Sequence, residues 1–259
     1  MMKSAVKILA VIPLLYLIGL PVFMTVKSKK TLCSGVVITI KDSAEYSFVT
    51  KRDIQNIIAG TAGRITGRQV SDIPVAEIEK NLYRLRELKN ADVYLTIDGV
   101  LNVVADQREP IMRVKAKDGN DYYIDNEGVV IRKRNLYPPR LHIISGNIII
   151  TKRMLEGVSV LDTAIKRSIL KDIFYLVSYI RSDSFWSAQI DQVYIDGNDE
   201  IDLIPRVGNH IIHLGTAESF TGKLKNLRVF YEEVLPEVGW NKYSVINLAF
   251  KDQIVCRRR

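Results

Sequence analysis

The sequence is poor in the residue types that usually carry chemistry. It has two cysteines and three histidines in 259 residues. Two cysteines exclude a dense disulfide framework; an oxidising compartment would permit a bridge between Cys33 and Cys256, but we interpret them as two unpaired thiols. His210 and His213 lie three residues apart in a strand-like run, so their side chains point to opposite faces and make a poor metal pair.

Catalytic motifs are also missing. The sequence has no Gly-x-Ser-x-Gly elbow, no glycine-rich phosphate loop and no His-Glu-x-x-His motif. A calcium site is conceivable at a cluster of acidic residues, Asp196, Asp199, Glu200 and Asp202. Their spacing is not that of an EF-hand loop, however, and favours a solvated turn. We therefore predict no catalytic residue, no metal and no cofactor. A membrane-anchored enzyme is the weakest of three functional hypotheses.

The positive charge is not arranged as in a nucleic-acid site. Lysine and arginine number 37 against 29 acidic residues. The densest basic clusters, at 132–134 and 257–259, are not interleaved with aromatic residues as they would be in a nucleic-acid groove. A solvated surface or a contact with anionic lipid headgroups is the favoured interpretation, and no nucleic-acid partner is predicted.

One long uncharged run is present, from Ile8 to Val26. As a helix it would be roughly 29 Å long, which is about the thickness of a bilayer's hydrocarbon core. A cleaved signal peptide is the alternative, but the run is longer than a usual signal core and no small-x-small cleavage site follows it. Lysines flank the run on both sides, so charge alone gives no orientation. We predict a transmembrane helix over 8–26 behind a short tail, 1–7.

The next segment has the pattern of a small α+β module. Gly35–Ile40 is β-branched and apolar, which predicts a strand. Thr50, with Asp53 three residues later, is typical of a helix N-terminus. A second helix follows Pro74, whose position suits a first helical turn. The apolar side chains of this second helix recur at helical spacing: Ile78, Leu82 and Leu85.

An Asp-Gly pair then predicts a hairpin. Asp98-Gly99 separates the apolar runs Val93–Ile97 and Val100–Ala105, and we expect both turn residues to need positive φ. The resulting order is strand, helix, helix, strand, strand.

A second section begins at Arg108-Glu109-Pro110. It contains many short strands and two predicted helices, at about Asp162–Arg181 and Ser219–Leu235. Its late strand, Tyr243–Phe250, is expected at the edge of a sheet, where unpaired backbone groups can accept a strand from a partner. The alternative is that this strand is merely part of the core.

Four short motifs, taken in order, resemble those of one family. Arg108-Glu109-Pro110 resembles an Arg-x-Pro junction, and Tyr122–Val130 resembles a Tyr-x-x-Asp…Gly segment. Ile212–Gly215 resembles a late strand, and Ile246–Phe250 resembles a closing Val-Asp-Leu-Arg-aromatic strand, with Asn247 and Ala249 in place of the acid and the base. Together with the order of elements, they make the chain similar to the bacterial cell-division family FtsQ, called DivIB in other lineages. Residues 35–105 resemble its POTRA module.

The resemblance implies an α+β fold with one N-terminal transmembrane helix, a POTRA-like β-α-α-β-β module over 35–107 and a mainly antiparallel β domain with two helices over 108–259. It also implies a non-enzymatic scaffold of the septal division complex. Its body would lie outside the cytoplasmic (inner) membrane and bind FtsB- and FtsL-like membrane proteins, which link it to septal peptidoglycan synthesis.

The resemblance also suggests particular residues. The expected partner-binding residues lie at the end of the chain: Leu248, Phe250, Asp252 and Ile254. Arg108 and Pro110 would set the angle between the two domains, because proline has a fixed φ and no backbone donor. A membrane-anchored POTRA chaperone or secretion component is the alternative function, although such proteins usually carry several POTRA repeats.

Overall fold

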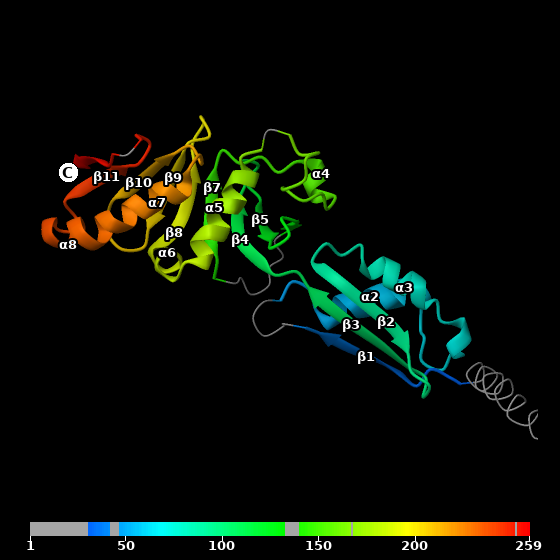
Figure 1. Cartoon of the computed structure of the whole chain (residues 1–259). Helices are drawn as coiled ribbons and strands as arrows, with labels where there is room; N and C mark the ends of the chain where they lie inside the picture. Colours follow the sequence, from blue (N-terminus) through cyan, green and yellow to red (C-terminus); the bar gives the residue numbers. More distant parts are fainter. Residues whose placement is uncertain (1–30, 42–46, 133–139, 167, 252) are drawn as a thin grey trace, which may run out of the picture. The chain divides into compact units, whose positions relative to one another are not determined.

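The structure is a computed structural model that describes residues 31–259 except 42–46, 133–139, 167 and 252. The chain divides into two compact units between Gln107 and Arg108. We call the described residues up to Gln107 unit 1 and those from Arg108 onward unit 2 (Figure 1). Each unit is built around its own β-sheet.

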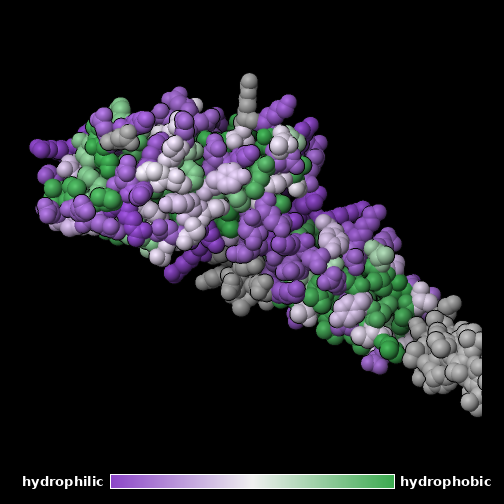
Figure 2. Space-filling model, in the orientation of Figure 1, coloured by the Kyte–Doolittle hydropathy of each residue, from purple (hydrophilic) through white to green (hydrophobic). Residues whose placement is uncertain are grey.

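Unit 1 has a three-stranded sheet with two helices on one side (Figure 1). The sheet order is β1-β3-β2, with β1 parallel and β2 antiparallel to the central strand β3. Its elements are β1 (Gly35–Ile40), α2 (Lys51–Ala62), the short 3₁₀ helix η1 (Val70–Asp72), α3 (Val75–Leu82), β2 (Leu88–Leu95) and β3 (Val100–Gln107). Burial alternates along β3, so one face of the sheet packs on the helices. Hydrophobic residues also gather on the side of unit 1 seen in Figure 2.

The first helix begins where the sequence predicts. The Thr50 hydroxyl accepts a hydrogen bond from the Asp53 amide at 3.2 Å, and the Asp53 carboxylate accepts one from the Thr50 amide at 2.9 Å. This capping box satisfies backbone donors that the first turn leaves free. Ile54 and Ile58 are buried one turn apart on the face toward the sheet.

The predicted hairpin is present, but its turn differs from the expectation. Gly99 has a φ of +79°, whereas Asp98 is not among the described non-glycine residues with positive φ. The loop that the hydrogen bonds enclose is three residues long, Ile97–Gly99, because the Thr96 amide donates to the Val100 carbonyl and the Gly99 amide donates to the Thr96 carbonyl. The prediction of positive φ at both turn residues was wrong, since only a two-residue type I′ turn requires it.

Unit 2 has a nine-stranded sheet with the order β12-β11-β10-β9-β8-β7-β4-β5-β6. β4–β7, β7–β8 and β10–β11 pair in parallel and the remaining neighbours are antiparallel. Its strands are β4 (Pro110–Lys115), β5 (Asp121–Asp125), β6 (Val130–Arg132), β7 (His142–Gly146), β8 (Ile190–Ile195), β9 (Ile201–Pro205), β10 (Ile211–Gly215), β11 (Tyr243–Asn247) and β12 (Val255–Arg258).

Helices cover one face of this sheet and close its core. They are α4 (Lys152–Leu155), α5 (Leu170–Ser182), α6 (Ser184–Gln189), α7 (Phe220–Val229), the π-helical segment η2 (Phe230–Val234) and α8 (Leu235–Val238). Figure 1 shows α5 to α8 on the same side of the strands. The core contains fully buried side chains from both layers, such as Ile173 and Leu176 from α5, Leu227 from α7 and Ile246 from β11.

The first long helix of unit 2 starts later than predicted. It begins at Leu170 rather than near Asp162. The Asp162 carboxylate accepts a hydrogen bond from the Ala164 amide at 2.7 Å, and the Ser168 hydroxyl accepts one from the Leu170 amide at 3.3 Å. Such local side-chain bonds offer the backbone an alternative to the helix, which apolar spacing alone does not reveal.

The predicted fold class needs a correction at the N-terminus. The α+β layers and the strand-helix-helix-strand-strand order agree with the structure. The transmembrane helix does not: among the residues that the structure describes, no helix is both long enough and apolar enough to cross a membrane. The predicted tail and helix, 1–26, lie outside the described residues. The prediction rested on an uncharged run of residues. Such a run shows that a segment is long and apolar, but it does not show which structure the segment adopts.

Candidate partner-binding edge

The late strand is not at the edge of the sheet, which corrects the prediction for Tyr243–Phe250. The part of this segment that forms a strand, β11, pairs in parallel with β10 on one flank and antiparallel with β12 on the other. Ile246 is fully buried in the core. Backbone groups that already bond on both flanks cannot accept a partner strand, so β11 is an inner strand and not a docking site.

The edge is β12, the last strand of the chain. Within the described part of the chain, no strand pairs with its outer flank. Val255, Arg257 and Arg258 are exposed, while Cys256 is half-buried against the core. An edge strand of this kind presents backbone donors and acceptors to solvent and can accept one more strand.

The direction of the free donors follows from one backbone bond. The Arg259 amide donates to the Lys242 carbonyl, toward β11, at 3.3 Å. Because donors alternate in direction along an antiparallel strand, the amides of Arg258 and Cys256 point away from β11. A side chain of β11 also binds β12. The Ser244 hydroxyl donates to the Arg257 carbonyl at 3.2 Å and accepts a hydrogen bond from the Arg257 Nε at 3.2 Å.

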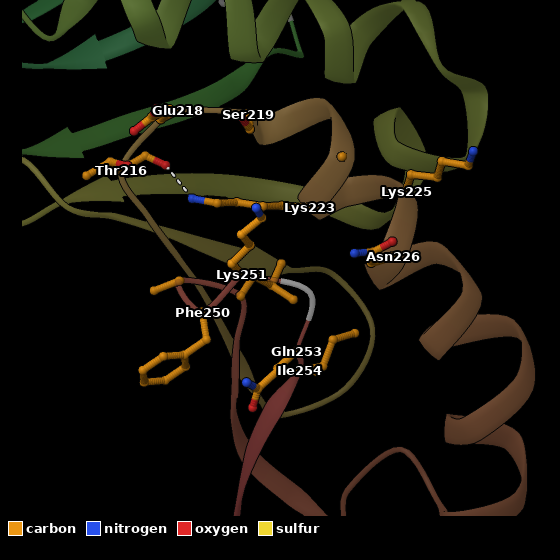
Figure 3. A pocket seen from close by; sticks show the side chains of 13 residues that line it. Thr216, Glu218, Ser219, Lys223, Lys225, Asn226, Phe250, Lys251, Gln253 and Ile254 are labelled. Atoms are coloured by element: carbon orange, nitrogen blue, oxygen red, sulfur yellow. Dashed lines mark hydrogen bonds between the residues drawn. The ribbon is translucent and has the colours of Figure 1, made fainter.

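A hollow of about 700 Å³ lies between the N-terminal part of α7 and the loop that precedes β12. Two segments line it, and Figure 3 shows their side chains. The segment from the end of β10 into α7 contributes Thr216, Glu218, Ser219, Lys223, Lys225 and Asn226, and the loop before β12 contributes Phe250, Lys251, Gln253 and Ile254. The Phe250 ring extends away from α7 (Figure 3) and is 53% exposed. An exposed aromatic ring beside an open strand edge is typical of a protein contact.

The surroundings of the edge are mostly basic. Lys225, Lys251 and Arg257 are exposed near the hollow or on β12, and among the described lining residues one is acidic, Glu218. Lys223 belongs to the fold instead: its ammonium group donates to the carbonyls of Leu214 and Thr216, both at 2.9 Å. Burial lowers the pKa of Lys223 from its ordinary value. The remaining exposed cations favour an acidic partner segment.

The four predicted partner-binding residues occupy different environments. Leu248 is 2% exposed and packs in the core, where its amide donates to the His213 carbonyl at 2.8 Å. Leu248, Phe250 and Ile254 all line the hollow, and Ile254 is partly buried against the core. Asp252 lies outside the described residues. Their role in binding stays a prediction, and of the described three only Phe250 offers a largely exposed side chain.

The two predicted junction residues are firmly held within unit 2. The Arg108 guanidinium pairs with Asp125 at 2.6 Å and with Glu127 at 2.9 Å. Asp125 is nearly fully buried, and its other oxygen accepts from the Val129 amide at 2.7 Å. Pro110 opens β4 beside a bulge, opposite Asp125. These bonds fix the start of unit 2; that Arg108 and Pro110 set an angle between domains stays a prediction.

The histidines serve the fold in the described structure. His210 is buried, and its Nε2 lies 2.6 Å from the Tyr231 hydroxyl. Burial lowers the pKa of His210 and raises that of Tyr231 above its usual range. His213 lies across from Asp202, with Nδ1 2.7 Å from the carboxylate. Among the described residues, no three histidine, cysteine or acidic side chains are grouped to hold a metal, and Cys33 and Cys256 are not joined by a disulfide in the structure.

Comparison with known protein families identifies both units. Residues 109–257, more than half of the chain, match the model of the family described as FtsQ/DivIB, C-terminal related. The chain belongs to this FtsQ/DivIB-related family. Residues 31–105 match the model of a POTRA-like domain. No curated protein matches the sequence.

Membership explains the combination of the two units. FtsQ/DivIB proteins are non-enzymatic scaffolds of cell division and are associated with the membrane at the division site. A POTRA-like unit followed by an FtsQ/DivIB-related unit therefore suggests a scaffold role in cell division.

Residue patterns missed the strand that forms the edge. β12 has only four residues, Val255–Arg258, and ends in arginines. The available signal was the segment after Phe250, which is long enough to turn back and pair with the strand before it.

Proposed function

We propose that this protein is a scaffold of the division septum that captures FtsB- and FtsL-like proteins by adding one of their strands to β12. It would act on the outer side of the cytoplasmic membrane and link these partners to septal peptidoglycan synthesis. The single observation that carries the proposal is that, in the described part of the chain, no strand pairs with the outer flank of β12 at the end of the nine-stranded sheet.

Three features of this surface suit strand addition. The outward amides of Cys256 and Arg258 give a partner backbone its hydrogen bonds. The hollow beside the loop 248–254 can receive side chains that flank the added strand. The exposed Phe250 ring supplies apolar area next to that strand.

Charge selects among possible partner strands. A segment with acidic residues would meet Lys251, Arg257 and Arg258, and opposite charges speed association and fix register. Arginines on an edge strand also repel a second copy of the same edge. The surface is thus protected against self-association and open to an acidic strand.

The test is the affinity of the full chain for the FtsB–FtsL-like pair of the same organism. Arg258→Pro removes an outward amide and places a ring in its position. We expect binding to weaken roughly tenfold or more, which corresponds to about 1.4 kcal/mol per factor of ten. Arg258→Ala is the matched control, because it removes the same charge and keeps the amide; it should weaken binding less.

Two measurements make the result decisive. The thermal unfolding of Arg258→Pro should stay near that of the parent protein, since proline is tolerated on edge strands. A folded Arg258→Pro protein with unchanged affinity would contradict strand addition. Equal losses for the proline and alanine variants would show that charge alone holds the partner.

Depletion in cells separates division from the alternative role in export. Long undivided filaments would support the scaffold. Normal division combined with loss of exported proteins would instead favour a chaperone or secretion function for the POTRA-like unit.

A further inference from the structure

The nine-stranded sheet of unit 2 has a second face, opposite the helices α5 to α8 (Figure 1). We call it the open face. Side chains alternate between the two faces along a strand. Leu203, Ile212 and Ile246 are fully buried and belong to the core. Their neighbours in sequence point to the open face and are not part of this core: Ile204, Ile211 and Val245.

The strand register places these three side chains in one row that ends at β12. Ile211 pairs with Val245, and Val245 pairs with Arg257 of the edge strand. The antiparallel pairing of β9 with β10 sets Ile204 next to Ile211. Because neighbouring strands lie about 4.8 Å apart, the row from Ile204 to Arg257 spans about 14 Å. A strand added to β12 would continue it.

A second row, beside the first, is polar in its middle and apolar at its ends. Tyr194 is 45% exposed and pairs with Asp202, which pairs with His213. His213 pairs with Asn247, and Asn247 pairs with Val255, which is 44% exposed on the edge strand. Apolar side chains therefore reach the edge in both rows.

The polar side chains of the second row are bonded within the chain. The Nδ1 of His213 lies 2.7 Å from the Asp202 carboxylate, and its Nε2 lies 3.6 Å from the Glu200 carboxylate. The side-chain carbonyl of Asn247 accepts a hydrogen bond from the Ala249 amide at 2.8 Å. Polar groups that keep such partners can be covered without the cost of burying unpaired groups. The open face is thus suited to carry another layer.

The position of the rows points to the chain that binds β12. A strand added there lies directly beside Val255 and Arg257, so the segment that leaves it starts at the margin of the open face. The other face of the sheet already carries helices (Figure 1). Apolar sheet faces are stable when a further layer buries them.

Charge points to the same occupant. Arg257 ends the first row, and its Nε donates to the Ser244 hydroxyl. Among the described residues, the two terminal nitrogens of Arg257 have no hydrogen-bond partner. An acidic side chain in the segment that leaves the added strand can pair with them.

We propose that the partner chain which adds a strand to β12 continues as an amphipathic helix on the open face. Its apolar side packs on Ile204, Ile211 and Val245, and an acidic residue lies at Arg257. One side chain per helical turn, about every 5.4 Å, nearly matches one side chain per strand, about every 4.8 Å. The inference rests on the proposed strand addition and assigns a second segment of the same partner.

The test is the affinity of the full chain for the FtsB–FtsL-like pair of the same organism. Ile211→Glu places a charge in the apolar row and should weaken binding roughly tenfold or more, which corresponds to about 1.4 kcal/mol per factor of ten. Ile149→Glu is the matched control, because Ile149 is 63% exposed in the loop after β7; it should bind as the parent does.

A second variant covers a failure to fold. Ile211→Gln removes apolar area without adding a charge and should keep the unfolding temperature of the parent, since Ile211 is 41% exposed. It should weaken binding less than Ile211→Glu and more than Ile149→Glu. Folded Ile211 variants that bind as tightly as the control would overturn the helix on the open face.

Hydrogen exchange separates this inference from strand addition. With the partner pair at saturation, the amides of Cys256 and Arg258 should be protected in the parent and in Ile211→Glu. Protection of both amides together with unchanged affinity of Ile211→Glu would overturn the helix and leave strand addition standing. Absence of protection in the parent would overturn strand addition, and the helix with it.

Sedimentation tests a second copy as the occupant. The parent chain alone should sediment as a monomer. A dimer that Ile211→Glu converts to a monomer, with unchanged affinity for the partner pair, would assign the open face to a second copy of this chain and overturn the proposal.

Discussion

β11 and β12 are neighbours with opposite roles. β11 is bonded on both flanks and places Ile246 in the core, whereas β12 is bonded on one flank and leaves Val255, Arg257 and Arg258 exposed. The inner strand therefore supports stability, and the outer strand is free to bind. A strand with an apolar pattern is a poor candidate for docking, because its pattern reflects burial that has already occurred.

The largest expected effect separates the two strands by stability. Ile246→Ala removes a fully buried side chain and should lower the free energy of unfolding by about 2–5 kcal/mol. Val255→Ala on β12 should change it by less than about 0.5 kcal/mol. Chemical denaturation of both variants measures the difference. Similar losses would mean that β12 contributes to the core as much as β11 does.

A smaller effect on stability is expected from the Ser244 side chain, which links β11 to β12. Ser244→Ala removes the hydroxyl that contacts the carbonyl and the Nε of Arg257. We expect a loss of about 1 kcal/mol in unfolding free energy, because a typical hydrogen bond contributes roughly that much. Hydrogen exchange should also accelerate at the amides of β12 more than at those of β10. Unchanged exchange at β12 would show that its backbone pairing alone holds it.

Low pH should lower the stability of the core of unit 2, and it should not affect the β12 edge. Burial lowers the pKa of His210 below its ordinary value of 6.5, so the folded protein binds this proton less readily than the unfolded chain. Stability is then present above the unfolded pKa and falls as the pH drops below about 6.5. Buried His142 has a pKa lowered for the same reason and adds to the effect.

Denaturation between pH 7.5 and pH 5.5 tests this dependence. The free energy of unfolding should fall with pH in the parent protein and fall less steeply in His210→Gln. The same slope in both proteins would exclude His210 as a source, and His142→Gln provides the corresponding control for the second histidine.

The smallest effect on stability is expected at Phe250. Its ring is 53% exposed, so Phe250→Ala should change the free energy of unfolding by no more than about 0.5 kcal/mol. Affinity for the FtsB–FtsL-like pair should nevertheless fall, because the variant removes apolar area beside the edge. A large loss of stability with unchanged affinity would assign Phe250 to the fold.

Local signals predicted many elements well. The strand Gly35–Ile40 has the predicted bounds. The helix after Thr50 begins at the predicted cap, since its capping box depends on residues only three apart. The predicted start of α5 was wrong. Two local side-chain hydrogen bonds compete with the helix before Leu170, although the apolar residues there have helical spacing.

The candidate site was harder to predict. The sequence pointed to the end of the chain and to Phe250 and Ile254, which the structure places at the hollow. It assigned the edge to the wrong strand, because the identity of an edge depends on which strand lies outside.

The sequence by itself determined the alternation of burial in the strands, the helix caps and the family to which the chain belongs, because these depend on residue types over short distances. Only the tertiary structure decided the strand order β10-β11-β12 and hence which backbone groups remain free. Strand order results from pairing between distant segments, each of which would satisfy its hydrogen bonds equally well with several neighbours.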